Sequence, residues 1–227
     1  MKRIVTMLSL LMALSILFAG AAMAEETTGT ESTGTVYTFE FEDLDFTGMV
    51  GDGNSGSAVA WEMVGTTPAF GIKVPDEQKP SNNHYVYFNY TAGLSFNFEI
   101  NASQATEAKM VIRLGSEIGN IVDLGPESGL AILVNGVALD YDPFTVESLQ
   151  INGGPVPYTF ADYEISVPVT LNEGANTVTF TILQRKTLSS PNDAPTMDCF
   201  TLTVTDDTVL TFTNNYQEAN DYPGYML

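Results

Sequence analysis

Residues 94–100 read LSFNFEI, and the alternation within this stretch decides the class of fold. Apolar side chains occupy every even position from 94 to 100, and polar side chains occupy the odd positions between them. Successive side chains of a β-strand point to opposite faces, so one face of this strand is expected to pack and the other to meet water. An amphipathic helix would instead repeat its apolar residues every three to four positions. The stretch is therefore predicted to be a strand of a half-buried sheet.

The chain from residue 36 onward is built from similar short runs, rich in β-branched and aromatic residues and separated by Gly, Pro, Asn and Asp clusters. No segment sustains a helical period. About ten strands without helices between them are typical of an all-β, two-sheet β-sandwich of the jelly-roll type. The predicted strands are 36–42, 58–64, 68–74, 84–90, 93–100, 107–114, 129–134, 137–139, 163–170, 176–184 and 197–205.

Two junctions carry strong turn chemistry. Asn135-Gly136 stands between LAILV and VAL, and this dipeptide favours the positive φ angles of a two-residue hairpin. The segment NEGAN, residues 172–176, is predicted to be a longer turn that joins two antiparallel strands.

The N-terminus has the layout of a secretory signal peptide. Lys2 and Arg3 precede an apolar run over residues 4–18, and Ala22-Met23-Ala24 supplies a small-x-small cleavage site. The apolar run is shorter than the roughly 20 residues that span a bilayer, and no second long run follows, so no membrane span is expected. We expect a signal peptide over 1–24, a flexible linker over 25–35, one sandwich domain over 36–205 and a C-terminal tail over 206–227. A bacterium-like export route would place the protein outside the cell.

The charge of the chain restricts its partners. It has 28 acidic and 8 basic residues, a formal net charge of −20, and removal of residues 1–24 takes away two basic residues and no acidic one, which gives −22. A surface this acidic excludes nucleic acid as a partner and suits divalent calcium. The single cysteine, Cys199, cannot form an internal disulfide and is interpreted as a buried, inert thiol.

Six segments occur in the order seen in carbohydrate-binding modules of families 6 and 35. They are FEFEDLDFTG (39–48), HYVYFNYTAGLSFNFEI (84–100), AKMVIRLGSE (108–117), ILVNGVAL (132–139), FADYEISVPVTLNEGANTVTF (160–180) and MDCFTLTV (197–204). The chain resembles these modules over residues 36–205. The resemblance implies a galactose-binding-domain-like sandwich that binds a polysaccharide or another glycan and carries a structural calcium ion.

Two acidic residues in the first predicted strand are candidate calcium ligands. Glu40 and Glu42 are two positions apart, so both carboxylates are expected on one face of the strand, and Ca²⁺ prefers such hard oxygen ligands. The resemblance adds Asp198, which opens the last strand and would clamp the chain ends through the ion. A solvated acidic face is the alternative interpretation of the pair. The acidic loop GDGNSGS, residues 51–57, lacks the ligand pattern of an EF-hand and is interpreted as an ordinary glycine-rich loop.

The resemblance also implies a sugar site made by an aromatic platform and an amide. Matched to the family pattern, Phe160 stands where the family has Trp, Tyr85 matches its Tyr, and Asn192 matches its Asn; Tyr158 and Trp61 are local substitutes. A phenylalanine has less area than tryptophan and no N–H donor. The alternatives are core packing for the two rings and a turn-forming role for Asn192.

Catalysis is not expected. The chain holds one histidine, His84, without a nucleophile pattern around it, and pairs of carboxylates arise by chance among 28 acidic residues. The predicted function is therefore that of a secreted, non-catalytic carbohydrate-binding protein. The alternative is an extracellular surface or matrix protein that uses the sandwich for protein contact or adhesion without binding sugar.

Overall fold

The computed structural model describes residues 34–44, 58–62, 74–88, 93–116, 119–151, 154–155, 159–183 and 194–212. The predicted signal peptide, residues 25–33 of the predicted linker, residues 68–73 of the strand predicted over 68–74, the loop over 51–57, Tyr158, Asn192 and residues 213–227 of the predicted tail lie outside the described residues. Within the described part of the chain, no helix is long and apolar enough to cross a membrane.

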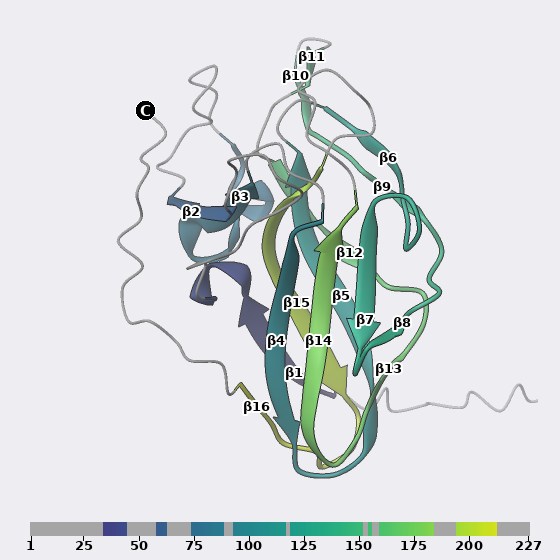
Figure 1. Cartoon of the computed structure of the whole chain (residues 1–227). Helices are drawn as coiled ribbons and strands as arrows, with labels where there is room; N and C mark the ends of the chain where they lie inside the picture. The colour runs from purple at the N-terminus through teal and green to yellow at the C-terminus, as the bar shows by residue number, and fades with distance from the viewer. Residues whose placement is uncertain are drawn as a thin grey trace, which may run out of the picture. The chain divides into compact units, whose positions relative to one another are not determined.

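Two antiparallel sheets pack face to face (Figure 1). The first sheet has the order β12 (Thr159–Glu164), β5 (Thr106–Ser116), β15 (Thr196–Val204), β3 (His84–Phe88), β2 (Ala58–Glu62), with β1 (Thr35–Glu40) beside β15 and β13 (Val169–Leu171) beside β5. The second has the order β16 (Leu210–Phe212), β4 (Ser95–Ala102), β14 (Gly174–Ile182), β7 (Leu130–Val134), β8 (Val137–Ala138).

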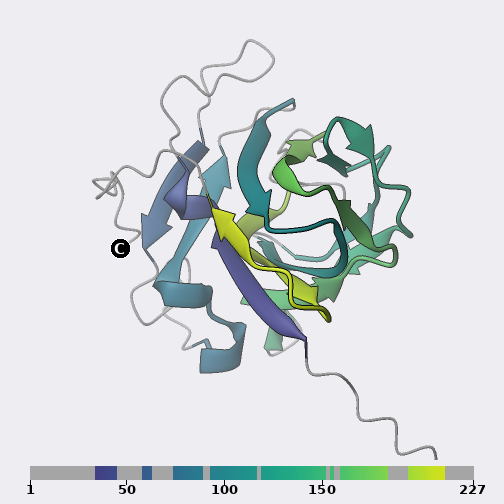
Figure 2. The same cartoon turned by 90° about the horizontal axis from the view of Figure 1, so that it is seen from below.

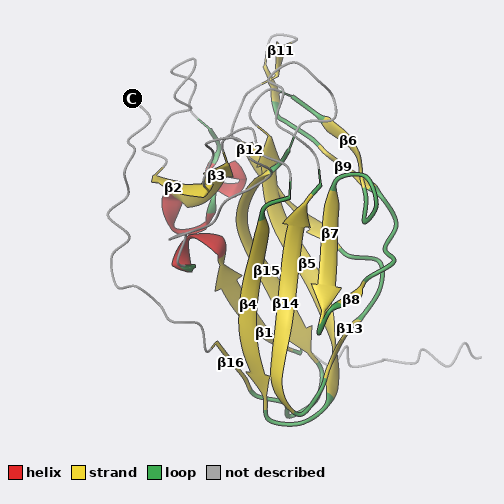
Figure 3. Ribbon diagram, viewed as in Figure 1, coloured by secondary structure: helices red, strands yellow, loops and turns green. Residues whose placement is uncertain are grey.

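Short elements complete the fold (Figure 3). Two small ladders pair β6 (Ile121–Leu124) with β9 (Phe144–Val146) and β10 (Gln150–Ile151) with β11 (Gly154–Pro155). The helical segments are single 3₁₀ turns: η1 (Phe41–Asp43), η2 (Asp76–Gln78) and η3 (Ser81–Asn83).

A cluster of phenylalanines fills the space between the two sheets. Phe98 of β4 lies with its ring centroid 4.8 Å from that of Phe200 in β15, and Phe41 lies 5.0 Å from Phe180 in β14. The even positions of residues 94–100 are buried, as their alternation predicts. The all-β, two-sheet sandwich is thus confirmed.

One of the two predicted turns has the expected form. Asn135 and Gly136 have φ angles of 53° and 79°, and Val134 pairs with Val137, so the two-residue hairpin is confirmed. The turn predicted over residues 172–176 joins β13 to β14, but the two strands do not pair, because β13 pairs with β5 in the first sheet whereas β14 lies in the second. The buried amide of Asn176 accepts from the Asn172 N–H and donates to the Asn172 carbonyl, 2.8 Å each, which allows the turn to cross between sheets.

The first and last long strands lie side by side, as expected. β1 pairs with β15 from Thr35↔Val204 to Glu40↔Cys199. Figure 2 shows β1 in purple beside β16 in yellow at the open side of the sandwich. The predicted boundary at residue 205 is wrong, since β16 adds a strand to β4. Its Leu210 is buried, and this burial stabilises a segment that the sequence analysis assigned to a tail.

The segment 74–83, which we call the strap, runs along the outer face of the first sheet. Core residues of β5 alternate with residues that point away from the core, and Arg113 is one of the latter. Its guanidinium donates to the carbonyls of Glu77 and Lys79, which ties the strap to β5.

Candidate functional site

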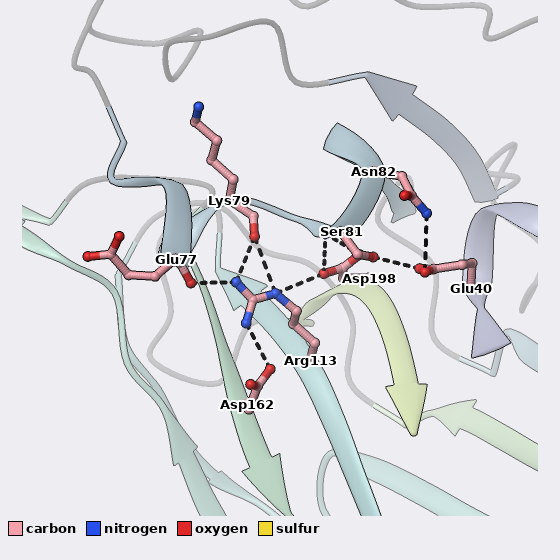
Figure 4. Close-up of polar contacts among 8 residues, drawn as sticks. All are labelled: Glu40, Glu77, Lys79, Ser81, Asn82, Arg113, Asp162 and Asp198. Atoms are coloured by element: carbon pink, nitrogen blue, oxygen red, sulfur yellow. Dashed lines mark hydrogen bonds and ion pairs between the residues drawn. The ribbon is translucent and has the colours of Figure 1, made fainter. Parts of the chain in front are cut away.

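The structure brings two of the three predicted metal ligands together. Glu40 ends β1 and Asp198 lies in β15, and the Ser81 hydroxyl of the strap stands between them, with Oγ 2.6 Å from Glu40 Oε2 and 2.6 Å from Asp198 Oδ1 (Figure 4). The Ser81 N–H donates to the Asp198 carboxylate, and Asn82 Nδ2 donates to Glu40 Oε1 at 3.2 Å. Asp198 is fully buried.

The Ser81 hydroxyl cannot satisfy both carboxylates. It carries one hydrogen and can donate it to one oxygen only. The other 2.6 Å contact therefore requires a proton on a carboxyl group or a cation among the oxygens. Burial raises the pKa of Asp198 to about 7, with the Glu40 charge adding to the effect and Ser81 and Arg113 opposing it. Burial also raises the pKa of Glu40. The site is thus short of positive charge.

Glu42 reaches the site by a different route from the predicted one. The strand ends at Glu40, and Phe41–Asp43 form the turn η1, so the argument that Glu40 and Glu42 share a strand face is wrong. Phe41 is buried in the core like Phe39, although it lies in the turn η1 and not in β1. Burial, followed by the charges of Glu40 and Asp198, raises the pKa of Glu42 to about 9. Its carboxyl group is therefore part of the same electrostatic cluster.

Cys199 also borders the cluster. Among the described residues, the group whose ligand atoms lie within 4.8 Å of one another consists of Glu40, Asp198 and Cys199. Burial raises the pKa of the Cys199 thiol, which keeps it protonated and agrees with an inert thiol. Carboxylate and hydroxyl oxygens fit calcium, whereas a thiolate would fit a softer ion. The donor set of Glu40, Asp198 and Ser81 fits calcium.

Arg113 is the cation nearest to the cluster in Figure 4. Its Nε lies 3.1 Å from Asp198 Oδ2, and one terminal nitrogen donates to the carbonyls of Glu77 at 2.6 Å and Lys79 at 2.7 Å. The other terminal nitrogen pairs with the exposed carboxylate of Asp162 at 2.8 Å. A single guanidinium fork thus joins Asp198 to the strap.

The two predicted platform residues lie against each other, outside the sandwich core. Tyr85 directly precedes the core residue Val86 in β3, and Phe160 shares its face of β12 with the exposed Asp162, so both rings point to the outer face of the first sheet. Their ring centroids are 5.3 Å apart, and both residues are buried. Gly115 lies beneath, where a Cβ would stand 3.0 Å from the Phe160 ring. The two rings are tilted by 53° to each other and buried, so they present no flat exposed ring face here; the sugar-binding role of Tyr85, Phe160 and Asn192 stays a prediction.

A cavity of about 300 Å³ opens beside Phe160. It lies between Gln78 of the strap, residues 147–150 and the start of β12 at Thr159–Ala161. Gln78 Oε1 is buried and has no hydrogen-bond partner among the described residues. The volume of the cavity is at the lower end of the range for small-molecule sites, about 300–1,000 Å³.

Searches of family models and of curated proteins found no match. Solved structures with a similar chain course include a family 35 carbohydrate-binding module from Clostridium thermocellum, at 15% identity and a TM-score of 0.43 over 74% of this chain and 97% of that one. A CBM35 from Paenibacillus barcinonensis shares 20% identity at a TM-score of 0.41 over 73% and 97%. A Podospora anserina GH26-CBM35 β-(1,4)-mannanase shares 18% at 0.42 over 76% of this chain and 28% of that one.

Ser81, Arg113 and Gln78 were not predicted as site residues from the sequence. The strap carries turn-forming residues, PDEQKPSNN over 75–83, but turn chemistry does not say which strand a turn will cross. Arg113 offered a signal, because it is one of 8 basic residues and stands in a strand whose alternate positions are apolar. A cation at such a position in an acidic chain points to a buried or half-buried carboxylate partner.

Proposed function

We propose that this chain is a secreted, non-catalytic carbohydrate-binding protein of the family 6 and 35 type, and that the cavity beside Phe160 receives a sugar unit. The observation that carries the proposal is this cavity, whose lining residues include Gln78, Glu147, Ser148 and Thr159 beside the buried Phe160. A pyranose offers C–H groups to an aromatic ring and hydroxyls to polar groups, so its recognition needs both kinds of surface. The order of the six sequence segments supports the same assignment.

The cavity also has rigid walls. The Thr159 hydroxyl accepts from the Leu149 N–H at 2.9 Å, and Asn120 accepts from the Ser148 N–H at 3.0 Å. On the opposite side, Arg113 ties down the carbonyls on both sides of Gln78. Walls held in place before binding reduce the entropy lost when a ligand is ordered.

The acidic cluster is proposed to hold calcium through Glu40 and Asp198, with Glu42 in reach. Three acidic groups share a buried region with one guanidinium, and a divalent cation would supply the missing positive charge. When bound, the ion would join β1 to β15 and hold Ser81 of the strap. Its role is structural, and it takes no part in a reaction.

Calorimetry tests the sugar site. Wild-type protein and Phe160→Ala are titrated with a panel of soluble neutral, acidic and amino oligosaccharides, with Phe212→Ala as a control that removes a ring in the second sheet. We expect heats with the wild type and with Phe212→Ala, and their loss in Phe160→Ala. Equal heats for all three proteins would exclude the cavity, and silence across the whole panel would refute sugar binding.

Thermal melting tests the metal site. Calcium is expected to raise the melting temperature of the wild type relative to EDTA, because a ligand that binds only the folded state stabilises it. Glu40→Gln should abolish that rise, whereas Glu107→Gln, an exposed glutamate at the start of β5, should keep it. A larger rise with zinc, lost in Cys199→Ser, would assign the site to a softer ion.

A second candidate function rests on the open strand edge. Val36 in β1 and Val209 before β16 are 58% and 53% exposed, although both are large apolar residues. An apolar strand edge can pair with another chain. If the chain assembles through this edge, size-exclusion chromatography should show an oligomer. Val36→Lys should convert that oligomer to a monomer. A monomer at every concentration would count against this function.

A further inference from the structure

We propose that the cavity selects a sugar unit without negative charge and prefers a 2-amino sugar over a neutral one, while it rejects uronic acids. This inference rests on the proposed function, because it names the ligand class of the same site. It follows from two properties of the cavity wall: the acceptors that the wall leaves for a ligand, and the sign of its charge.

Two donors in the wall are used within the wall. The Gln150 amide N–H group donates to the carbonyl and the hydroxyl of Ser148, 3.3 Å each, and the Ser148 hydroxyl donates to Asn120 Oδ1 at 3.3 Å. The Ser148 hydroxyl and the Gln150 amide are therefore less available to a carboxylate or another group that only accepts.

Acceptors remain. Gln78 Oε1 is buried without a partner in the described part of the chain, and a buried acceptor left without a hydrogen bond lowers stability. The neighbours of Gln78 are fixed, because the Glu77 and Lys79 carbonyls both accept from Arg113. Rotation of the Gln78 side chain alone would present this acceptor to a ligand that donates a hydrogen bond, and the backbone of the strap would stay in place. A sugar hydroxyl or a sugar ammonium group can donate this hydrogen bond.

The charge of the wall has one sign. Glu147 is the charged side chain among the cavity-lining residues that the structure describes, and the whole chain carries a net charge of −20. A carboxylate near Glu147 is repelled and an ammonium group is attracted. Among sugars that share one backbone, an ammonium group should therefore raise the affinity for the cavity and a carboxylate should lower it.

Oligosaccharides with a common backbone isolate the charge. Tetramers of β-1,4-linked glucose, glucosamine and glucuronic acid are titrated by calorimetry, alongside the corresponding galactose, galactosamine and galacturonic acid tetramers. For at least one backbone we expect the amino tetramer to bind about threefold to tenfold more tightly than the neutral one, and the uronic tetramer to bind weakest. Added salt should narrow these differences, because it screens a partly exposed carboxylate.

Two variants assign the effect to residues. Glu147→Gln should remove the preference for the amino tetramer and keep the binding of the neutral tetramer. Its matched control is Glu107→Gln, because Glu107 lies at the end of β5 that is far from the cavity. Gln78→Met, which keeps length but removes the acceptor, should weaken every tetramer about fivefold, whereas Gln104→Met in the turn after β4 should not. Melting temperatures of all four variants separate a lost contact from a lost fold.

The outcomes distinguish this inference from the function on which it rests. If tetramers bind and Phe160→Ala abolishes binding, but the uronic tetramers bind best, the proposed ligand class is wrong and carbohydrate binding stands. The same holds if Glu147→Gln leaves the order of affinities among the amino, neutral and uronic tetramers unchanged. If no oligosaccharide of any series binds, both fail together.

Discussion

Replacing Arg113 by methionine is expected to lower the free energy of unfolding by about 3–5 kcal/mol. The substitution keeps an apolar stem and removes the guanidinium, which is the ion-pair partner of Asp198 at 3.1 Å. The Asp198 side chain has no exposed area, so water cannot take over the lost contact. The carbonyls of Glu77 and Lys79 lose their donor as well. Breaking a buried pair from one side leaves an unpaired charge, which accounts for the large magnitude.

Equilibrium urea denaturation in EDTA measures this change, and a double-mutant cycle assigns it. Asp162→Asn is the matched control, because Asp162 binds the same guanidinium at 2.8 Å but its side chain is 63% exposed, and such a pair contributes about 0–1 kcal/mol. Adding Asp198→Asn to Arg113→Met removes both charges, so the double variant should be more stable than the sum of the single losses predicts, by about 2 kcal/mol. A loss below about 1 kcal/mol for Arg113→Met, or strict additivity in the cycle, would refute the role assigned to the pair.

In EDTA, the free energy of unfolding of the wild type should fall as pH rises from about 5 to about 8. Folding raises the pKa of Glu42 to about 9 and that of Asp198 to about 7. In this pH range the folded state therefore holds protons that the unfolded chain has lost. Glu42→Gln should flatten the fall, and a rise in stability with pH would contradict it. Gly115→Ala should lower the free energy of unfolding by about 1–3 kcal/mol and weaken glycan binding. The reason is that the new Cβ would stand 2.8 Å from Thr196 Oγ1 and 3.0 Å from the Phe160 ring. An unchanged thermal melt and unchanged calorimetry would exclude this crowding. Gly136→Ala should cost about 1 kcal/mol in a urea melt without affecting binding, because its φ is 79°; a neutral effect would contradict the hairpin strain.

The sandwich was predictable because it depends on local patterns. Alternation over residues 94–100 fixes which side chains enter the core, and Asn135-Gly136 has a backbone preference of its own. The pairing of β1 with β15 also followed from the class of fold. These features depend on residues that are close in sequence or on topology shared by many sandwiches.

The candidate site was predictable only in part, because it depends on long-range packing. Glu40 and Asp198 meet as expected, but Ser81 joins them from a turn that is 41 residues from one and 117 from the other. Alternation places Phe160 and Tyr85 on a face, yet it does not tell whether a third layer covers that face. The strap is such a layer, and no pattern within residues 75–83 indicates that their carbonyls bind Arg113.

The contacts of β1 have a consequence for truncation of the chain. Tyr37 donates to the Thr208 carbonyl at 3.1 Å, and the Phe39 ring lies 6.0 Å from that of Phe212, so β1 is held by the segment 208–212 as well as by β15. Truncation after residue 205 would remove the acceptor of Tyr37 and the ring beside Phe39, together with the strand that pairs with β4. Loss of the C-terminal segment should therefore loosen strands of both sheets.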